Sequence, residues 1–309
     1  MSTTEVHDPS DAQAAYLKEL IAAGRVIATG VPGVYGRDRV FEDVLERFDQ
    51  LVSGLAKNDK AEWMRFPPVV NRKVFERSEF QKSFPQLTGT VFSFEGDTKK
   101  HQALLECIAH GQDWSHTQHM TDLVLTPAAC YPVYPLFTGT LPEGGRTVDM
   151  ASWCFRHEPS GDPARMQLFR VREFVRVGSS ETVTAWRDLW LERGLHLLRG
   201  LGLDANPEAA SDPFFGRGGK LLAVNQKEQR LKFEVLVPIT SKEKPTAVVS
   251  FNWHQEHFGQ LFDIKTSDGK IAQTACLGFG MERVVLALFK THGLDPLRWP
   301  AEVRKQLWP

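Results

Sequence analysis

The longest amphipathic pattern in the chain covers residues 40–61. Its apolar residues recur every three or four positions, as they do along one face of an α-helix: Phe41, Val44, Leu45, Phe48, Leu51, Val52 and Leu55. The pattern predicts a helix with one buried face and a charged face in solvent. Further helices are predicted over residues 12–23, 98–108 and 180–200, and the last of these ends near two glycines.

Extended runs dominate the rest of the chain. Two of them, ASWCFRHE and QLFRVREFVRV, are separated by PSGDPARM, whose prolines and glycine predict a hairpin with a long loop. Other strand-like runs are FPPVV, GTVFSF, TDLVLTPAAC, GKLLAVNQ, RLKFEVLVPI, AVVSFNWH and IAQTACLG, and the last passes through a glycine turn into a helix, GMERVVLALFKTHG. Because strands and helices do not alternate regularly, we expect an α+β fold with a mostly antiparallel sheet flanked by helices. Neither GxGxxG nor GxxxxGKS occurs, which disfavours a dinucleotide-binding fold and a P-loop.

Composition places the chain among soluble globular proteins. It has 309 residues, of which 42% are hydrophobic and 24% charged, and no apolar run approaches the roughly 18 residues that span a bilayer. The first residues, MSTTEVHDPSDAQAA, are polar and acidic, so we expect no secretory signal and a cytoplasmic location, with residues 1–10 disordered. The formal net charge of −1 lacks the basic surplus that is usual for proteins that bind long nucleic acids.

The cysteines and histidines match no compact metal motif. Four cysteines lie far apart and outside any CxxC pair, so a metal site would have to be assembled from distant segments. The runs HTQH and HQEH lack the HExxH arrangement, which favours surface or core histidines over a metal site.

Two segments carry residues suited to phosphate chemistry. The hairpin places Arg156 and Glu158 at the end of its first strand, Arg165 in the loop, and Arg170 and Arg172 on the returning strand. A guanidinium donates two parallel hydrogen bonds to adjacent phosphate oxygens. The alternative is a solvated hairpin with cross-strand Arg–Glu pairs.

The second segment is CLGFGMERVV. Gly278 and Gly280 allow a sharp turn from strand into helix, and the free N–H groups of the new helix favour an anion. Arg283 lies in the first helical turn, where a cation is unfavourable unless it meets an anionic ligand. The alternative is an ordinary glycine-containing helix start.

Together the two segments resemble motifs 2 and 3 of the class II aminoacyl-tRNA synthetases, which implies the catalytic fold of that class. FRHE and the later Phe169-Arg170 match motif 2, and GFGMER matches motif 3. TPAACYPVY, RVREFVRVG and QTACLGFGMER resemble the segments that bind zinc in the atypical seryl-tRNA synthetases of methanogens, and even more closely those of the amino acid:[carrier protein] ligases. The likeness runs from about residue 30 to 293, so we expect an N-terminal segment over 1–29 and a catalytic domain over 30–309.

This resemblance implies one zinc ion per subunit, bound by Cys130, Glu173 and Cys276. Three protein ligands would leave a fourth position for the amino group of the substrate. Taken singly, each cysteine is more simply a buried, inert thiol, and Glu173 a partner of Arg170 or Arg172. Cys107 and Cys154 receive no role.

The resemblance also implies roles in binding ATP, Mg²⁺ and an amino acid. Arg156 is expected at the α-phosphate and the attacking carboxylate, Glu158 at the adenine amino group, and Arg283 at the γ-phosphate. Arg165 is expected at the departing pyrophosphate, with Phe169 stacked on adenine. The remaining expected residues are Met166, Glu234 and Ser250 for ATP and its Mg²⁺, and Asn252 and His254 for the amino acid; the last two alternate on one face of an extended segment.

The implied reaction is formation of an aminoacyl-adenylate from ATP and a small amino acid, glycine first and alanine next. Because few residues flank the family likeness, tRNA is not the expected acceptor; the phosphopantetheine thiol of a small acidic carrier protein is. The alternatives are a tRNA or small-molecule acceptor, and an inactive synthetase paralogue with a regulatory role. A homodimer is expected through residues 40–90, for which simple core packing is the alternative.

Overall fold

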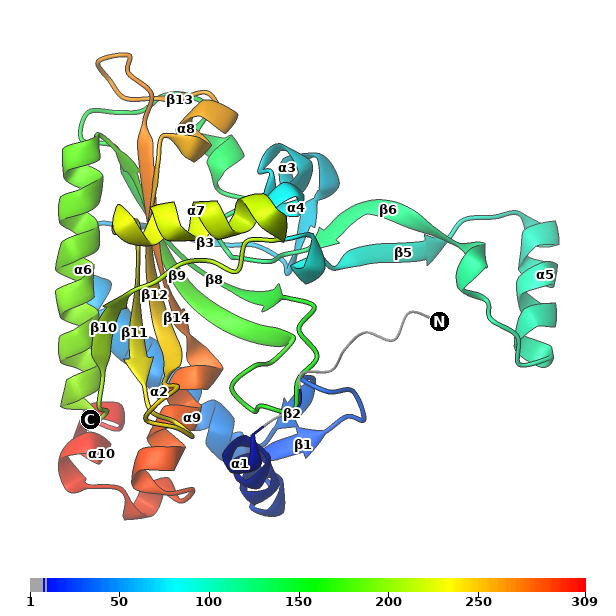
Figure 1. Cartoon of the computed structure of the whole chain (residues 1–309), viewed down its shortest axis with the longest axis horizontal. Coiled ribbons are helices and arrows are strands. Elements are labelled where there is room, and N and C mark those ends of the chain that lie inside the picture. Colours follow the sequence, from blue (N-terminus) through cyan, green and yellow to red (C-terminus); the bar gives the residue numbers. More distant parts are fainter. Residues whose placement is uncertain (1–7, 9) are drawn as a thin grey trace.

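The computed structural model describes residue 8 and residues 10–309, and a seven-stranded sheet forms its centre (Figure 1). The strand order is β10 (Asn206–Ala209), β11 (Lys232–Val237), β12 (Thr246–Gln255), β14 (Gln273–Gly280), β9 (Leu168–Gly178), β8 (Arg146–Phe155) and β3 (Glu62–Arg65). The edge strand β3 runs parallel to β8, and the other pairs are antiparallel. The α+β fold and the β8–β9 hairpin are therefore confirmed.

Helices cover one face of this sheet. They are α2 (Arg39–Ala56), α6 (Ser180–Gly200) and α9 (Met281–His292), with α1 (Asp11–Ala22) and α10 (Ala301–Leu307) packed beside them. The strands direct every second side chain into this layer, so Phe174 stacks on Trp190 of α6 with 4.6 Å between ring centroids. The hydroxyl of Tyr16 in α1 donates to the carbonyl of Leu286 at 2.7 Å, which ties the chain before residue 30 to this layer.

The opposite face of the sheet carries a second apolar cluster and a group of short elements. These are β4 (Val69–Asn71), α3 (Arg72–Arg77), α4 (Phe80–Ser83), η1 (Pro85–Leu87), η3 (Tyr134–Phe137), β7 (Gly139–Thr140), α8 (His257–Leu261) and β13 (Ile264–Lys265). The strands β1 (Val26–Ala28) and β2 (Tyr35–Arg37) pair with each other, and η4 (Pro296–Arg298) precedes α10.

An arm projects from the body on this side (Figure 1). It consists of β5 (Thr90–Phe94), α5 (Thr98–Ala109), η2 (Ser115–Thr117) and β6 (Gln118–Leu125). β6 pairs with both β5 and β4, so the arm continues a small three-stranded sheet. The helix predicted over residues 98–108 is α5, and its N-cap Asp97 accepts from the backbone of Lys100.

Most of the predicted helices end where their sequence patterns do, and α6 covers residues 180–200 as predicted. The helix predicted over 40–61 ends earlier, at Ala56. The reason is tertiary: Asp59 accepts hydrogen bonds from Trp190 and Arg193 of α6, and Lys60 has a positive φ of 51°.

The strand predicted for GKLLAVNQ is wrong. These residues belong to α7 (Gly216–Glu228), which crosses in front of the sheet (Figure 1). Its apolar residues Leu221, Leu222 and Val224 are exposed rather than buried, so their run does not mark a core strand. Leu, Ala, Gln, Lys and Glu are good helix formers, and that propensity decides the local structure here.

The prediction of disorder for residues 1–10 lies mostly outside the described residues, although Ser10 is described and caps α1 through a reciprocal pair of hydrogen bonds with Gln13. Over the described range, no helix is long and apolar enough to span a bilayer.

Candidate active site

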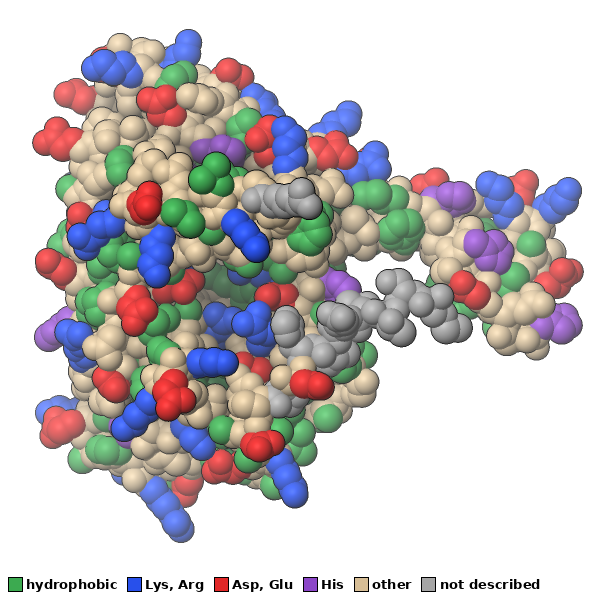
Figure 2. Space-filling view, in the orientation of Figure 1, with side chains coloured by type: hydrophobic (Ala, Val, Ile, Leu, Met, Phe, Trp, Pro, Cys, Tyr) green, Lys and Arg blue, Asp and Glu red, His purple; other side chains and the backbone are tan. Residues whose placement is uncertain are grey.

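A cavity of about 600 Å³ opens on the face of the sheet away from α6. Figure 2 shows the surface hollowed below α7, with basic side chains in the hollow. Alternate residues of four strands point into it, and the register sets Glu173 opposite Gly278, Glu234 opposite Ser250 and Asn252 opposite Cys276. Such a volume is typical of a small-molecule site.

Cys130, Glu173 and Cys276 meet at the inner end of this cavity. Each is buried, and their ligand atoms all lie within 4.8 Å of one another. They come from the turn after β6, from β9 and from β14, so no local sequence pattern connects them. Two thiolates and a carboxylate form a donor set that suits Zn²⁺ better than a hard cation.

The electrostatics of the cluster also fit a cation. The hydrogen bond that the Cys130 thiol donates to Cys276, together with burial, raises the pKa of Cys130, and burial raises the pKa of Glu173. The hydrogen bond with Cys130 acts to lower the pKa of Cys276, but burial and the nearby Glu173 outweigh it and the pKa is raised. Burial therefore opposes negative charge on all three groups, and a divalent metal among them would compensate that charge and favour their ionised forms.

Two predicted substrate residues support the same cluster. The side-chain amide of Asn252 donates to the sulfur of Cys276 at 3.6 Å, and Nε2 of His254 lies 3.6 Å from that sulfur. Nδ1 of His254 lies 3.0 Å from the hydroxyl of Thr274. Burial lowers the pKa of His254 to about 4, so this imidazole is neutral at pH 7.

The predicted ATP residues line the outer part of the same cavity. Arg156 follows directly after β8, and its guanidinium lies 5.6 Å from the ring centroid of Phe169. Arg283 is half-buried in the first turn of α9, where it donates to the carbonyls of Ala164 and Ala247. Burial, with a smaller contribution from the nearby Arg156, lowers the pKa of Arg283. Two guanidiniums thus converge on one space, as a polyphosphate requires.

Other predicted residues surround these two. Glu158 and Met166 also line the cavity, as do Glu234 and Ser250. Arg165 does not line the cavity, and its guanidinium donates to the carboxylate of Glu158 at 2.9 Å.

Arg170 and Arg172 do not face the cavity. Arg170 binds Glu42 and Glu282, and Arg172 binds Asp49 and Asp149 on the helix-covered side of the sheet. Both arginines form ion pairs, but mainly with carboxylates of α2 and α9 and with Arg172 buried, so they are not the solvated cross-strand Arg–Glu pairs of the alternative. Glu173 points to the other face of β9, so it is not their partner.

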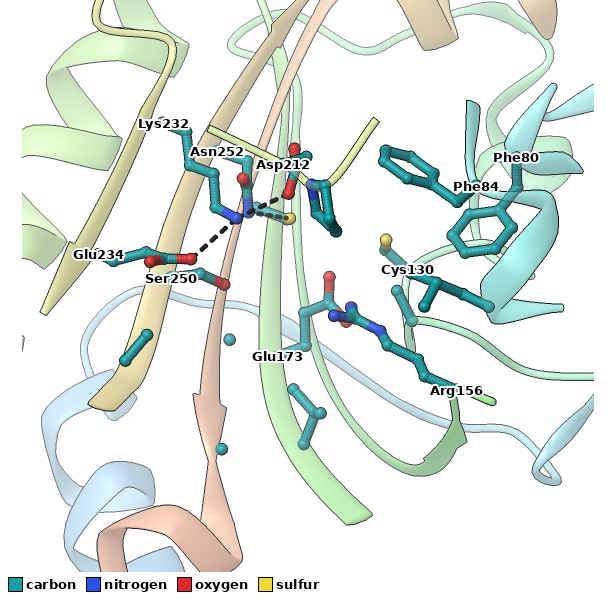
Figure 3. A pocket seen from close by; sticks show the side chains of 18 of the residues that line it. Phe80, Phe84, Cys130, Arg156, Glu173, Asp212, Lys232, Glu234, Ser250 and Asn252 are labelled. Atoms are coloured by element: carbon teal, nitrogen blue, oxygen red, sulfur yellow. Dashed lines mark hydrogen bonds and ion pairs between the residues drawn. The ribbon is translucent and has the colours of Figure 1, made fainter. Parts of the chain in front are cut away.

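Sequence reasoning missed a charged cluster in the cavity wall. The ammonium of the buried Lys232 donates to Asp212 at 2.6 Å and to Glu234 at 2.9 Å (Figure 3). Gln226 of α7 exchanges two hydrogen bonds with Asp212, so the cluster fastens α7 over the cavity. Lys232 lies two positions before Glu234 on the same strand face, which is the one signal the sequence offered.

Comparison with known proteins finds relatives of this chain, although no protein-family model matches it. The chain is 47% identical over 280 residues to amino acid–[acyl-carrier-protein] ligase 2 of Bradyrhizobium diazoefficiens, covering 90% of the chain and 84% of that protein. It is 45% identical to ligase 1 of the same organism, covering 89% of the chain and 85% of that protein. The type-2 serine–tRNA ligase of Methanococcus aeolicus is 31% identical over 60% of the chain and 37% of its own length.

Solved structures share the fold. The M. kandleri seryl-tRNA synthetase in complex with A. aeolicus tRNASec superposes with a TM-score of 0.80 at 22% identity, over 99% of the chain and 62% of that protein. The Pyrococcus horikoshii seryl-tRNA synthetase complexed with ATP gives 0.69 at 15% identity, over 94% and 62%. With the identity to the two Bradyrhizobium proteins spanning most of both chains, the protein belongs to the amino acid–[acyl-carrier-protein] ligase family, built on the class II aminoacyl-tRNA synthetase catalytic fold.

Proposed function

We propose that the enzyme activates a small amino acid, glycine first and alanine next, as an aminoacyl-adenylate and transfers it to the phosphopantetheine thiol of an acidic carrier protein. The observation that supports this most is the joining of two groups in one cavity: the Cys130–Glu173–Cys276 cluster, and the guanidiniums of Arg156 and Arg283. The names of the two Bradyrhizobium relatives support the carrier protein as acceptor.

The Cys130–Glu173–Cys276 cluster would hold the zinc ion, and a zinc bound there would supply a Lewis acid for the neutral amine of the amino acid. Asn252 and His254 hold Cys276 in place, so they orient the ligand set and limit the room left beside it.

In the activation step a carboxylate oxygen of the amino acid attacks the α-phosphorus of ATP, and pyrophosphate leaves. Arg156 would neutralise charge on the α-phosphate, and Arg283 would bind the γ-phosphate, both from positions fixed before the substrate arrives. Phe169 and Glu158 would bind adenine, and Arg165 would exchange its contact with Glu158 for the pyrophosphate. Glu234 and Ser250 would face the Mg²⁺ that accompanies ATP.

In the transfer step the carrier thiol attacks the carbonyl carbon of the adenylate. A carbon–sulfur bond forms, the bond from the carbonyl carbon to the phosphate oxygen breaks, AMP leaves, and the thiol proton passes to solvent. The carrier must therefore dock near the cavity mouth.

We propose α7 as the docking helix. It borders the cavity through Leu222 and Gln226, and it exposes Leu221 and Val224 to solvent. Lys220 and Lys227 are also exposed and would attract an acidic partner.

We also propose a homodimer. Within residues 40–90 the apolar face of α2 is buried in the core, so that part is core packing. The edge strand β3 remains as the expected contact, because Trp63 on it is 67% exposed and open edges favour pairing.

The test is amino-acid-dependent pyrophosphate exchange across all amino acids, with zinc measured on the same sample. We expect exchange with glycine, weaker exchange with alanine, and about one zinc per chain. A holo carrier protein should then gain the mass of one aminoacyl group. Exchange without a mass shift, or retention of charged tRNA, would point to another acceptor, and the absence of exchange would exclude the activation step.

A further inference from the structure

The arm formed by residues 90–125 has no buried helix face. None of the residues of α5, all of which the structure describes, is buried. Leu105 and Ile108 lie three positions apart on one side of this helix and are exposed. A helix with an apolar stripe normally buries that stripe, and a 12-residue helix is marginal in water without such packing.

The strands of the arm expose further apolar side chains. Phe92 of β5 lies directly opposite Met120 of β6, and both are exposed. Leu123 on β6 and Trp114 before it are exposed as well. The six side chains of the arm are between 37% and 56% exposed. At about 200 Å² for each full side chain they present roughly 600 Å² of apolar surface, at the upper end for a monomer and close to one side of a stable interface.

The net negative charge of the arm disfavours two classes of binding partner. Residues 90–125 contain five acidic residues and two lysines. An acidic surface repels nucleic acid, whose affinity comes mainly from basic contacts to phosphate. It equally disfavours the acidic carrier proposed above, for which α7 offers lysines.

The arm begins next to the open edge of the main sheet. The chain passes from edge strand β3 (Glu62–Arg65) through β4 (Val69–Asn71), and β4 pairs with β6 of the arm. The exposed Trp63 on β3 and the apolar side chains of the arm therefore lie on segments that are directly connected. An interface along the edge of β3 would lead through this connection to the base of the arm.

We infer that the arm clasps a second copy of this chain. A twofold axis beside β3 brings the body of each copy next to the arm of the other, so that both arms bury their apolar faces in one closed interface. The inference rests on the proposed homodimer, and it is independent of the amino acid and the acceptor.

The decisive variant is Leu105→Glu with Ile108→Glu, and the matched control is Leu297→Glu, an exposed leucine on η4. Sedimentation equilibrium should show a wild-type dimer, at least 100-fold weaker dimerisation of the double variant, and an unchanged control. Circular dichroism confirms that each variant is folded. A monomeric wild type, or a dimer that the double variant leaves intact, would overturn the inference.

Hydrogen exchange of the wild-type protein gives a second readout that needs no variant. The amides of α5 should exchange slowly in the dimer and at least tenfold faster on dilution to monomer, because little but the partner would protect them. Fast exchange of α5 in a dimer would contradict the clasp. A raised KM for the carrier in the double variant, with dimerisation unchanged, would assign the arm to the carrier instead.

Pyrophosphate exchange on the same wild-type sample separates this inference from the proposed chemistry. A dimer dependent on the arm but inactive in exchange would leave the inference standing and remove the proposed activity. A monomer that is active in exchange would overturn the inference and leave the proposed activation step standing.

Discussion

Replacing Glu282 by alanine tests how the hairpin is fastened to α9. The carboxylate is almost fully buried, and it accepts from the backbone N–H of Arg170 at 2.7 Å and from Nε of Arg170 at 2.8 Å. It also lies 3.4 Å from the guanidinium of Arg37, which is itself buried. Removing it leaves two cations with Glu42 as their nearest remaining carboxylate.

The expected loss follows from the burial. Breaking a buried ion pair from one side costs about 3–5 kcal/mol, since the remaining charge keeps its desolvation cost. Glu42 still neutralises Arg170 in part. We therefore expect Glu282→Ala to lower the free energy of unfolding by about 3–4 kcal/mol. For a chain of 309 residues the melting temperature should fall by roughly 5–6 °C.

Urea unfolding at pH 7, followed by circular dichroism, measures this difference. Glu302→Ala is the matched control, because Glu302 is exposed in the first turn of α10 and contributes at most ~1 kcal/mol there. A loss below about 1 kcal/mol for Glu282→Ala, or equal losses for both variants, would refute the assigned role of this carboxylate.

Three further predictions concern the cavity. Cys276→Ser should remove bound zinc and lower pyrophosphate exchange at least 100-fold, whereas Cys107→Ser, on the arm, should change neither; retained zinc would contradict the ligand set. Leu221→Glu should raise the KM for the carrier about tenfold while amino-acid-dependent pyrophosphate exchange stays the same, and an unchanged KM would exclude α7 as the docking helix. Burial acts to raise the pKa of Asp212, but Lys232 and Gln226 outweigh it and the pKa is lowered, so the stability this carboxylate contributes is present above about pH 4 and lost below. Stability should therefore fall more steeply with acid in the wild type than in Asp212→Asn, and parallel curves would contradict the assignment.

Where a pattern was local, the sequence predicted the fold well. The period of α6 and the proline-rich loop between β8 and β9 are set by neighbours in the chain, and both elements form as predicted. The helix predicted over residues 40–61 ends at Ala56, because Trp190 of α6 donates a hydrogen bond to Asp59. The sequence around Asp59 gives no signal of that distant contact. In α7 the same apolar residues fit a strand or a helix; they are exposed, so helix propensity rather than burial decides the structure.

The sequence by itself indicated the guanidinium-lined side of the cavity, because Arg156 and Arg283 are each set in a local strand–loop or strand–turn–helix pattern. It grouped Cys130, Glu173 and Cys276 through resemblance alone, since these three residues share no local spacing. The tertiary structure brought those three side chains within 4.8 Å and paired Lys232 with Asp212. It also left the apolar side chains of the arm exposed within the described part of the chain. Such contacts depend on sheet register and strand order, which join residues a hundred positions apart and which no local periodicity encodes.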